Sequence, residues 1–356
     1  MMHARRGSRR RARLSTDLTI LGIVGVLLIA ALAAGGVSLY QQYYSPSAFV
    51  QRYLDLLSSG RAADALLLPG VSVDLALLED SGIDRTASEA LLRPAALAPL
   101  TDAHITSEKA ADGAYAVSIE YRAAGVRGMT TFQVVQDGWA GITPDWRFAR
   151  SPLAEIELTV RGSDQFTVNG FAIDRRQVSA AGADATPLDP LHLMVLTPGM
   201  YSVTVDTAIA ASPGVSVLAD TPLARTPVDV QAMPTEQFTE VVQQRVEEFL
   251  LGCATQEVLQ PTSCPFGLEV QNRLVDGSVP KWSIAEQPKV TVVPDGSNWA
   301  IPPTDAVAHI EVEIMSLFDG SVQTVSEDVP FQVDGTIAIM PDGSASIRVG
   351  SPSSDE

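Results

Sequence analysis

The sequence predicts an α+β protein with one N-terminal transmembrane helix, then two cone-shaped helix-plus-antiparallel-sheet domains that flank a small β-sandwich-like domain. An uninterrupted apolar run extends from Leu18 to Leu39. Two amphipathic helical stretches, one ending at Gly60 and one at Gly252, each precede a series of alternating strands. We expect a basic cytoplasmic tail, a transmembrane helix, three domains and a disordered tail at residues 1–17, 18–39, 45–151, 152–234, 235–350 and 351–356.

The apolar run is long enough to cross a bilayer. Its 22 residues would span about 33 Å as a helix, against a hydrocarbon core of about 30 Å. Six arginines precede the run and no comparable cluster follows it, so the N-terminus is expected in the cytoplasm and the C-terminal region outside the cell. Tyr40, Tyr43 and Tyr44 follow directly, where an interfacial aromatic belt is expected. The alternative is a cleaved signal peptide, although apolar signal cores are typically about 7 to 15 residues long.

The charge differs between the two sides of this run. Six arginines and one aspartate give residues 1–17 a net charge of +5, so the remaining residues carry −23 of the total of −18. An acidic exterior repels phosphate backbones and argues against nucleic acid as a partner. The expected partners are the lipid bilayer, through the one span, and cell-wall material or an envelope protein.

The two cysteines, Cys253 and Cys264, lie outside the cell in the predicted topology. An even number of cysteines in an oxidising compartment indicates a disulfide. A redox pair would typically be Cys-x-x-Cys, and a zinc site would need two further ligands nearby. We therefore predict that these two residues form a disulfide bond.

The first domain begins with a helix whose start is marked by Ser45 and Pro46. A second helical stretch is expected at residues 62–68. Alternation over residues 115–122 and a second run over 129–135 predict a hairpin that reverses in the region of residues 125–128.

The middle domain shows strand patterns and turns. Ile156, Leu158 and Val160 alternate with polar residues, and residues 201–205 show the same alternation, which predicts two strands. The pattern of residues 166–170 predicts a strand followed by a tight turn. Residues 179–190 read as a loop. A small β-sandwich-like unit is the expected result.

The third domain repeats the order of the first. Phe238, Val242 and Val246 lie on one stripe of a helix expected to end at Gly252. Segments 54–69 and 248–261 share a plan of helix, small-residue break, second helix and proline, which we interpret as a diverged internal duplication. Asp-Gly-Ser recurs at 276, 295, 319 and 342, which favours strand reversals there.

The sequence offers no convergent catalytic chemistry. The histidines are His3, His104, His192 and His309, and none has a ligand partner at metal-binding spacing. Ser278 and Lys281 fit Ser-x-x-Lys, but Pro280 between them argues against a helix. Trp139, Trp146, Trp282 and Trp299 are expected to fill the concave sheets, or alternatively to line an open pocket. We predict no catalytic residue, no cofactor and no metal site.

The order of parts resembles a known type of membrane protein. The helix-then-sheet unit that begins SPSAFVQRYLDLL looks like extracytoplasmic domains of the nuclear transport factor 2-like fold, and FTVNG and LTPGMYSVTVD look like small PEGA-like β-domains. The whole chain is similar to the TcaA-type, teicoplanin-resistance-associated proteins of Gram-positive bacteria, which implies a role at the cell wall. It lacks the N-terminal zinc-ribbon cysteines often seen in that type, so no zinc-linked function is implied.

Together these observations favour a non-enzymatic, membrane-anchored extracytoplasmic binding or scaffolding protein of the bacterial cell envelope. One alternative is a single-span assembly component of a secretion or conjugation apparatus. Another is an enzyme that uses a pocket in one of the cone-shaped domains. The arginine-rich, lysine-poor composition is of an actinobacterial type.

Overall fold

The computed structural model describes residues 21–30, 40, 42–72, 82–141 and 143–350. Residues 21–30 are helical, whereas the predicted ends of the span, Leu18 and Leu39, lie outside the described residues. Among the described helices, none combines the length and the apolar character needed to cross a bilayer. The chain divides into two compact units. The first comprises the described parts of Met1–Asp74 with Pro99–Leu153 and Asp220–Pro222, and the second comprises those of Leu75–Ala98, Ala154–Ala219 and Leu223–Glu356.

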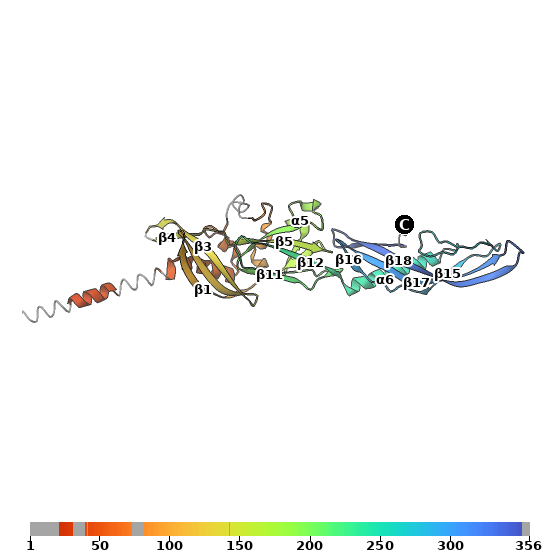
Figure 1. The fold of residues 1–356 in the computed structure, drawn as a ribbon, viewed down its shortest axis with the longest axis horizontal. Helices are drawn as coiled ribbons and strands as arrows, with labels where there is room; N and C mark the ends of the chain where they lie inside the picture. The colour runs from red at the N-terminus through yellow and green to blue at the C-terminus, as the bar shows by residue number, and fades with distance from the viewer. Residues whose placement is uncertain (1–20, 31–39, 41, 73–81, 142, 351–356) are drawn as a thin grey trace, which may run out of the picture. The chain divides into compact units, whose positions relative to one another are not determined.

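The first unit is an α+β layer, as predicted. Its elements are α2 (Pro46–Ser58), α3 (Ala62–Leu66), β1 (Leu100–Ala111), β2 (Ala114–Ala123), β3 (Val126–Ala140) and β4 (Thr143–Phe148). The four strands form one antiparallel sheet in the order β1-β2-β3-β4, and α2 packs against β1, β2 and β3 (Figure 1). The helix begins where Ser45 Oγ accepts a hydrogen bond from Ala48 N at 3.1 Å. Its apolar face meets the sheet at Tyr53, whose ring lies 5.8 Å from that of Phe132 and 5.2 Å from that of Phe148.

The predicted β2–β3 hairpin is present, with a tighter reversal than expected. The turn consists of Ala124 and Gly125, whose φ angles are 49° and 84°, and β3 begins at Val126. Two consecutive residues with positive φ match the right-handed twist of the flanking strands. Residues 126–128 therefore belong to the strand and not to the turn.

The middle part of the second unit consists of two sheets, as expected for a β-sandwich. One has the strand order β11-β9-β6-β7 and the other β12-β5-β8. The strands are β5 (Leu153–Arg161), β6 (Gln165–Val168), β7 (Phe171–Asp174), β8 (Leu191–Leu196), β9 (Gly199–Thr204), β11 (Val215–Ala219) and β12 (Arg225–Gln231), with the short pair β10 (Ala210–Ala211) and β13 (Met233–Pro234). Residues of both sheets, such as Leu158 and Tyr201, belong to the same buried core. The loop predicted at 179–190 contains only a short 3-10 turn, η3 (Gly182–Asp184), and it follows the one-turn helix α5 (Arg175–Val178).

A segment that precedes β1 in the sequence packs on this sandwich. It contains η1 (Glu89–Leu91) and η2 (Pro94–Ala96), and Leu91 and Ala96 are fully buried in the core of the second unit. The backbone of Ser88 bridges to Leu193 in β8. Asn169 in the β6–β7 turn donates from Nδ2 to Ala96 O at 2.8 Å, so the turn recognised in the sequence also holds this segment.

The C-terminal part of the second unit combines a long helix with an antiparallel sheet. Its elements are α6 (Glu236–Ala254), β14 (Arg273–Leu274), β15 (Lys281–Glu286), β16 (Val293–Asp295), β17 (Asn298–Met315), β18 (Val322–Ile339) and β19 (Ala345–Gly350). β17 pairs with β14, β15, β16 and β18, and β18 pairs with β19. The glycines of all four Asp-Gly-Ser motifs have positive φ, and three of these motifs join antiparallel neighbours: β16 to β17, β17 to β18 and β18 to β19.

The expected helical likeness between segments 54–69 and 248–261 is not present in three dimensions. α6 continues through Gly252 to Ala254, and residues 255–261 form no helix. In the first unit, by contrast, α2 and α3 are separate helices. A glycine inside a helix costs only about 1 kcal/mol relative to alanine, and burial of Leu250 and Cys253 favours continuation of α6. The duplication inferred from this likeness is therefore not supported.

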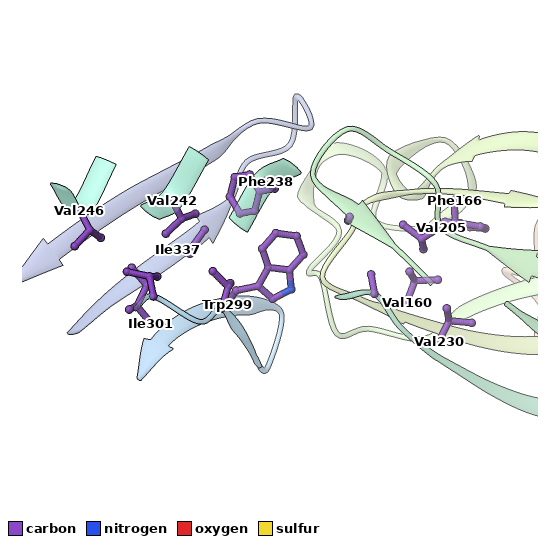
Figure 2. Packing of buried hydrophobic residues seen from close by; sticks show 14 of the residues in the cluster. Val160, Phe166, Val205, Val230, Phe238, Val242, Val246, Trp299, Ile301 and Ile337 are labelled. Carbon is purple, nitrogen blue, oxygen red and sulfur yellow. The ribbon is translucent and has the colours of Figure 1, made fainter. Parts of the chain in front are cut away.

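One buried core extends through the second unit. Figure 2 shows Phe238 and Val242 of α6 beside Trp299, and Val160 and Val230 of the sandwich strands on the other side of the indole. Trp299 is fully buried, and its ring lies 5.3 Å from that of Phe238. Gly162 has a φ of 80°, and a Cβ added there would lie 3.0 Å from Trp299 Nε1, so close packing against this tryptophan requires glycine.

Candidate functional site

The cysteines and the tyrosines that the sequence singled out are all described. The Sγ atoms of Cys253 and Cys264 lie 2.00 Å apart, which is a disulfide-bonded distance. The bond ties the last turn of α6 to the irregular segment that follows it. Tyr40, Tyr43 and Tyr44 are exposed, with 44%, 55% and 44% of their surfaces accessible. Their expected role at a membrane interface remains a prediction.

Three of the four tryptophans fill the interior, and one does not. Trp146, Trp282 and Trp299 are at most 8% exposed. Trp139, at the end of β3, is 66% exposed, so the expectation that the tryptophans fill the concave sheets does not hold for this residue.

Sequence reasoning missed one buried polar cluster in the second unit. Glu155 of β5 is 1% exposed, and its carboxylate accepts hydrogen bonds from Asp84 N at 2.7 Å and His192 Nδ1 at 2.7 Å. Arg225 Nε of β12 lies 3.0 Å from the same carboxylate. In the sequence, Glu155 is one of the polar residues that alternate with the apolar residues of β5 and were expected to face solvent. The signal that could have revealed it is its position between Ala154 and Ile156, next to the apolar start of the strand.

This cluster contains the only group of described residues with metal-ligand potential. Glu155, Glu157 and His192 each offer one ligand atom, and these atoms lie within 4.8 Å of one another. The Glu155 carboxylate, however, is already neutralised by Arg225 and shared with two other donors, and Arg225 also lies 3.9 Å from Glu157. A divalent cation would be repelled by this guanidinium and would have to displace these bonds. The arrangement therefore links four chain segments and is poorly suited to holding a metal.

The remaining histidines and the Ser-x-x-Lys motif also form no catalytic arrangement among the described residues. His104 is exposed and His309 bonds to Asp328 on the open face of the sheet, at 2.7 Å. Ser278 lies in a turn and its Oγ accepts from Glu313 N at 3.2 Å. Lys281 begins β15 and pairs in register with Glu311. Residues 278–280 are irregular and lead directly into β15, so no helix aligns the serine with the lysine, as Pro280 predicted.

The most distinctive exposed feature is the hairpin of β17 and β18. Each strand is 18 residues long, or about 60 Å when fully extended. β18 pairs with β19 only over Asp334–Ile339. Within the described chain, residues 322–333 of β18 pair on one side alone, with β17. Their other side is an open strand edge.

The hydrogen bonds at the tip of the hairpin determine which residues of β18 direct their backbone groups to the open edge. Ser316 N donates to Ser321 O at 2.9 Å, which makes this opposed pair a hydrogen-bonded one. Pairs alternate along an antiparallel ladder, so odd-numbered residues of β18 bond to β17 and even-numbered residues direct their N–H and C=O groups to the open edge. Pro330 obeys this phase, because a proline has no N–H to contribute to the ladder. The free backbone groups of the open edge therefore belong to Val322, Thr324, Ser326 and Asp328, before the interruption at Pro330.

The tip presents apolar side chains to solvent on a well-ordered turn. Leu317 is 69% exposed, Phe318 is 99% exposed and Val322 is 53% exposed. Ser316 Oγ accepts from Phe318 N at 3.2 Å. Hydrogen bonds from Ser321 to the Asp319 carboxylate lower its pKa below the ordinary value and fix the turn. The turn thus holds Phe318 outward, away from any core of the unit.

The open edge carries one sign of charge. Residues 322–334 include Glu327, Asp328 and Asp334 and contain no lysine or arginine. If two copies paired along this edge in a centred antiparallel register, the acids at 327 and 328 would face each other and oppose the association. A basic extended segment would find complementary charge and free backbone groups on the same edge.

No protein-family model, curated protein or solved structure matches this chain.

Proposed function

We propose that this protein is a non-enzymatic, membrane-anchored binding or scaffolding protein of the bacterial cell envelope, which captures an extended, basic segment of a partner protein on the β17–β18 hairpin. Its membrane topology, its TcaA-type affiliation and the nuclear transport factor 2-like and PEGA-like character of its domains belong to the same proposal. The observation that carries it is the one-sided pairing of β18 next to an apolar tip.

Strand addition suits this edge on energetic grounds. Backbone hydrogen bonds to an open edge give affinity, and side chains that alternate along the added strand give specificity. Full burial of Phe318 or Leu317 by a partner would contribute about 1.5–3 kcal/mol for each side chain. The tip is preorganised by the bonds of Ser316 and Asp319, so little ordering cost accompanies its burial.

The charge of the edge defines the partner. Glu327 and Asp328 lie midway along the open edge, and Glu311 and Glu313 face solvent on the neighbouring β17. Opposite charges across strands contribute roughly 0.2–1 kcal/mol per pair, and like charges destabilise. A partner strand with lysine or arginine at alternate positions is therefore favoured over an acidic one.

The test measures binding of defined peptides to the full chain in lipid nanodiscs. The probe is a fluorescent ten-residue peptide of alternating valine and lysine, and its control alternates valine and glutamate. We expect saturable binding of the lysine peptide alone. Ser326→Pro removes one outward N–H without touching the β17 ladder, and should weaken binding about tenfold, which corresponds to about 1.4 kcal/mol. Ser326→Thr keeps that N–H and is the matched control.

Two results would count against the proposal: equal binding of the lysine peptide to Ser326→Pro and wild type, and a cross-link at position 318 that persists unchanged in Ser326→Pro. Binding of the lysine peptide that is equal in Ser326→Pro and wild type would indicate charge attraction without strand pairing. A photoreactive benzoylphenylalanine at position 318 should form a discrete cross-linked species in intact cells, and that species should disappear in the Ser326→Pro background. The same label at Leu67, which is 81% exposed in the first unit, serves as the control.

A further inference from the structure

Trp139 is placed by a local irregularity of the β3–β4 ladder. Gln136 opposes Trp146, but Gly138 opposes Asp145, so Asp137 is an extra residue in β3. Such a bulge changes which face the following side chain occupies. Without it, position 139 would oppose Thr143 and face the outer side of the sheet.

With the bulge, Trp139 opposes Pro144. Directly opposed residues of an antiparallel pair project on the same face. Pro144, Trp146 and Phe148 are the buried residues of β4, and Phe148 contacts Phe49 of α2, with the ring centroids 5.0 Å apart. Trp139 therefore lies on the face of the sheet that α2 covers, yet it is 66% exposed because it lies beyond the covered part.

The contacts along β4 give the direction in which Trp139 lies. Phe148 meets Tyr53 and Phe49 in α2, and Trp146 Nε1 donates to Tyr44 O at 2.8 Å. Residue 148 of β4 therefore lies beside residues 49 and 53, and residue 146 lies beside residue 44, which is nearer the N-terminus. Two further residues along β4 cover about 7 Å, and they lead to the Pro144–Trp139 pair on the side of Tyr43 and Tyr40.

We propose that Trp139 contacts the lipid headgroup region together with Tyr40, Tyr43 and Tyr44, as a second membrane contact of the first unit. The inference rests on the membrane anchor of the proposed function. The four aromatic side chains are exposed, and the tyrosines directly follow the apolar run that ends at Leu39. Tryptophan and tyrosine favour the interface because each ring has an apolar body and a polar group that stays hydrated.

The position of Trp139 and the three tyrosines favours a lipid bilayer as the partner that contacts them. A hairpin that lies beside the first residues after an apolar run must come close to the bilayer if that run spans it. With the span and Trp139 both in contact with lipid, rotation of the first unit about the anchor would be restricted. A single flexible connection would leave that rotation free.

The experiment uses the full chain in vesicles of phosphatidylcholine and phosphatidylglycerol, with brominated phosphatidylcholine as a quencher of tryptophan emission. Flotation of the protein with the vesicles is measured first. We expect quenching of part of the wild-type emission, and about a twofold or larger loss of the quenched fraction in Trp139→Phe. Trp282→Phe, which alters a buried residue of the second unit, should retain the quenched fraction. Circular dichroism spectra of both variants, compared with that of the wild type, would check that they fold.

Two outcomes would overturn the inference, and they are distinguishable. Flotation with equal quenching in wild type and Trp139→Phe would exclude the contact while leaving the anchor intact. Absence of flotation would exclude the anchor and the contact together. Absence of flotation would also contradict the anchored part of the proposed function, whereas capture of a peptide by the β18 edge is tested separately through Ser326.

Discussion

Arg225 Nε lies 3.0 Å from the Glu155 carboxylate, whose side chain has no exposed surface. The arginine itself is 39% exposed, so the pair is buried at one end and hydrated at the other. Asp84 N and His192 Nδ1 complete the environment of the carboxylate. A buried acid of this kind is tolerated because each of its oxygen atoms accepts hydrogen bonds.

We predict that Glu155→Ala destabilises the second unit by about 2–4 kcal/mol, because three donors lose their acceptor in a buried site. Urea unfolding followed by the emission of Trp282 and Trp299 would measure it. Glu157→Ala is the control, since Glu157 is one third exposed and lies 3.9 Å from Arg225. An equal loss of unfolding free energy in Glu155→Ala and Glu157→Ala would contradict this stabilising role of Glu155.

Arg175 offers a second test in the same unit. Its guanidinium is 99% buried and donates to Val160 O at 2.7 Å and to Asp189 O at 2.9 Å. Arg175→Ala should cost about 3 kcal/mol, because buried carbonyl groups and Asp164 lose their partner. Arg176→Ala should cost much less stability than Arg175→Ala, because Arg176 is exposed and its ion pair with Asp174 is hydrated. Thermal unfolding of the two variants would show whether the neighbouring arginines differ in this way.

Acid should weaken the second unit through carboxylates whose pKa is lowered in the folded state. A hydrogen bond from the Thr86 hydroxyl, at 2.6 Å, is the main cause that lowers the pKa of Asp84 below its ordinary value of 3.8. The stabilisation is complete above the ordinary value and is lost as the pH falls below it, through the lowered pKa. Thr86→Val should therefore flatten the dependence of unfolding free energy on pH below 3.8, as measured by urea titrations at several pH values. An unchanged slope would show that this carboxylate contributes nothing.

The disulfide should stabilise the end of α6. Cys253 and Cys264 are 11 residues apart, and closing a loop of this length contributes about 3 kcal/mol in the chain-entropy model. Reduction should lower the urea midpoint of the wild type. The double variant C253A/C264A should unfold at a similarly low midpoint that a reducing agent does not change. A midpoint in the variant equal to that of the oxidised wild type would contradict this contribution.

Local patterns predicted the elements of this fold well. Ser45 and Pro46 mark the start of α2, the 115–122 alternation matches β2, and the Asp-Gly-Ser motifs lie at turns with positive φ. These features depend on neighbouring residues only: a capping side chain, a period of two, and a glycine that tolerates positive φ.

Predictions from local sequence patterns were wrong where contacts between distant segments decide the structure. The helix expected after residue 254 is absent. The segment there is instead held by the disulfide at Cys264 and by burial of Phe266 in the core of the second unit. The face of the sheet that Trp139 occupies depends on one extra residue in β3. Neither effect leaves a signal in a window of a few residues.

The sequence alone predicted α2, most of α6, several of the strands, the turns at the Asp-Gly-Ser motifs and the cysteine pair, because capping, periodicity and turn chemistry act over short distances. Only the tertiary structure brought Glu155, His192 and Arg225 together, left one side of β18 unpaired and directed Trp139 to the face that carries Tyr44. These relationships join residues that are far apart along the chain. Pairing partners and burial decide them, and both are properties of the complete fold.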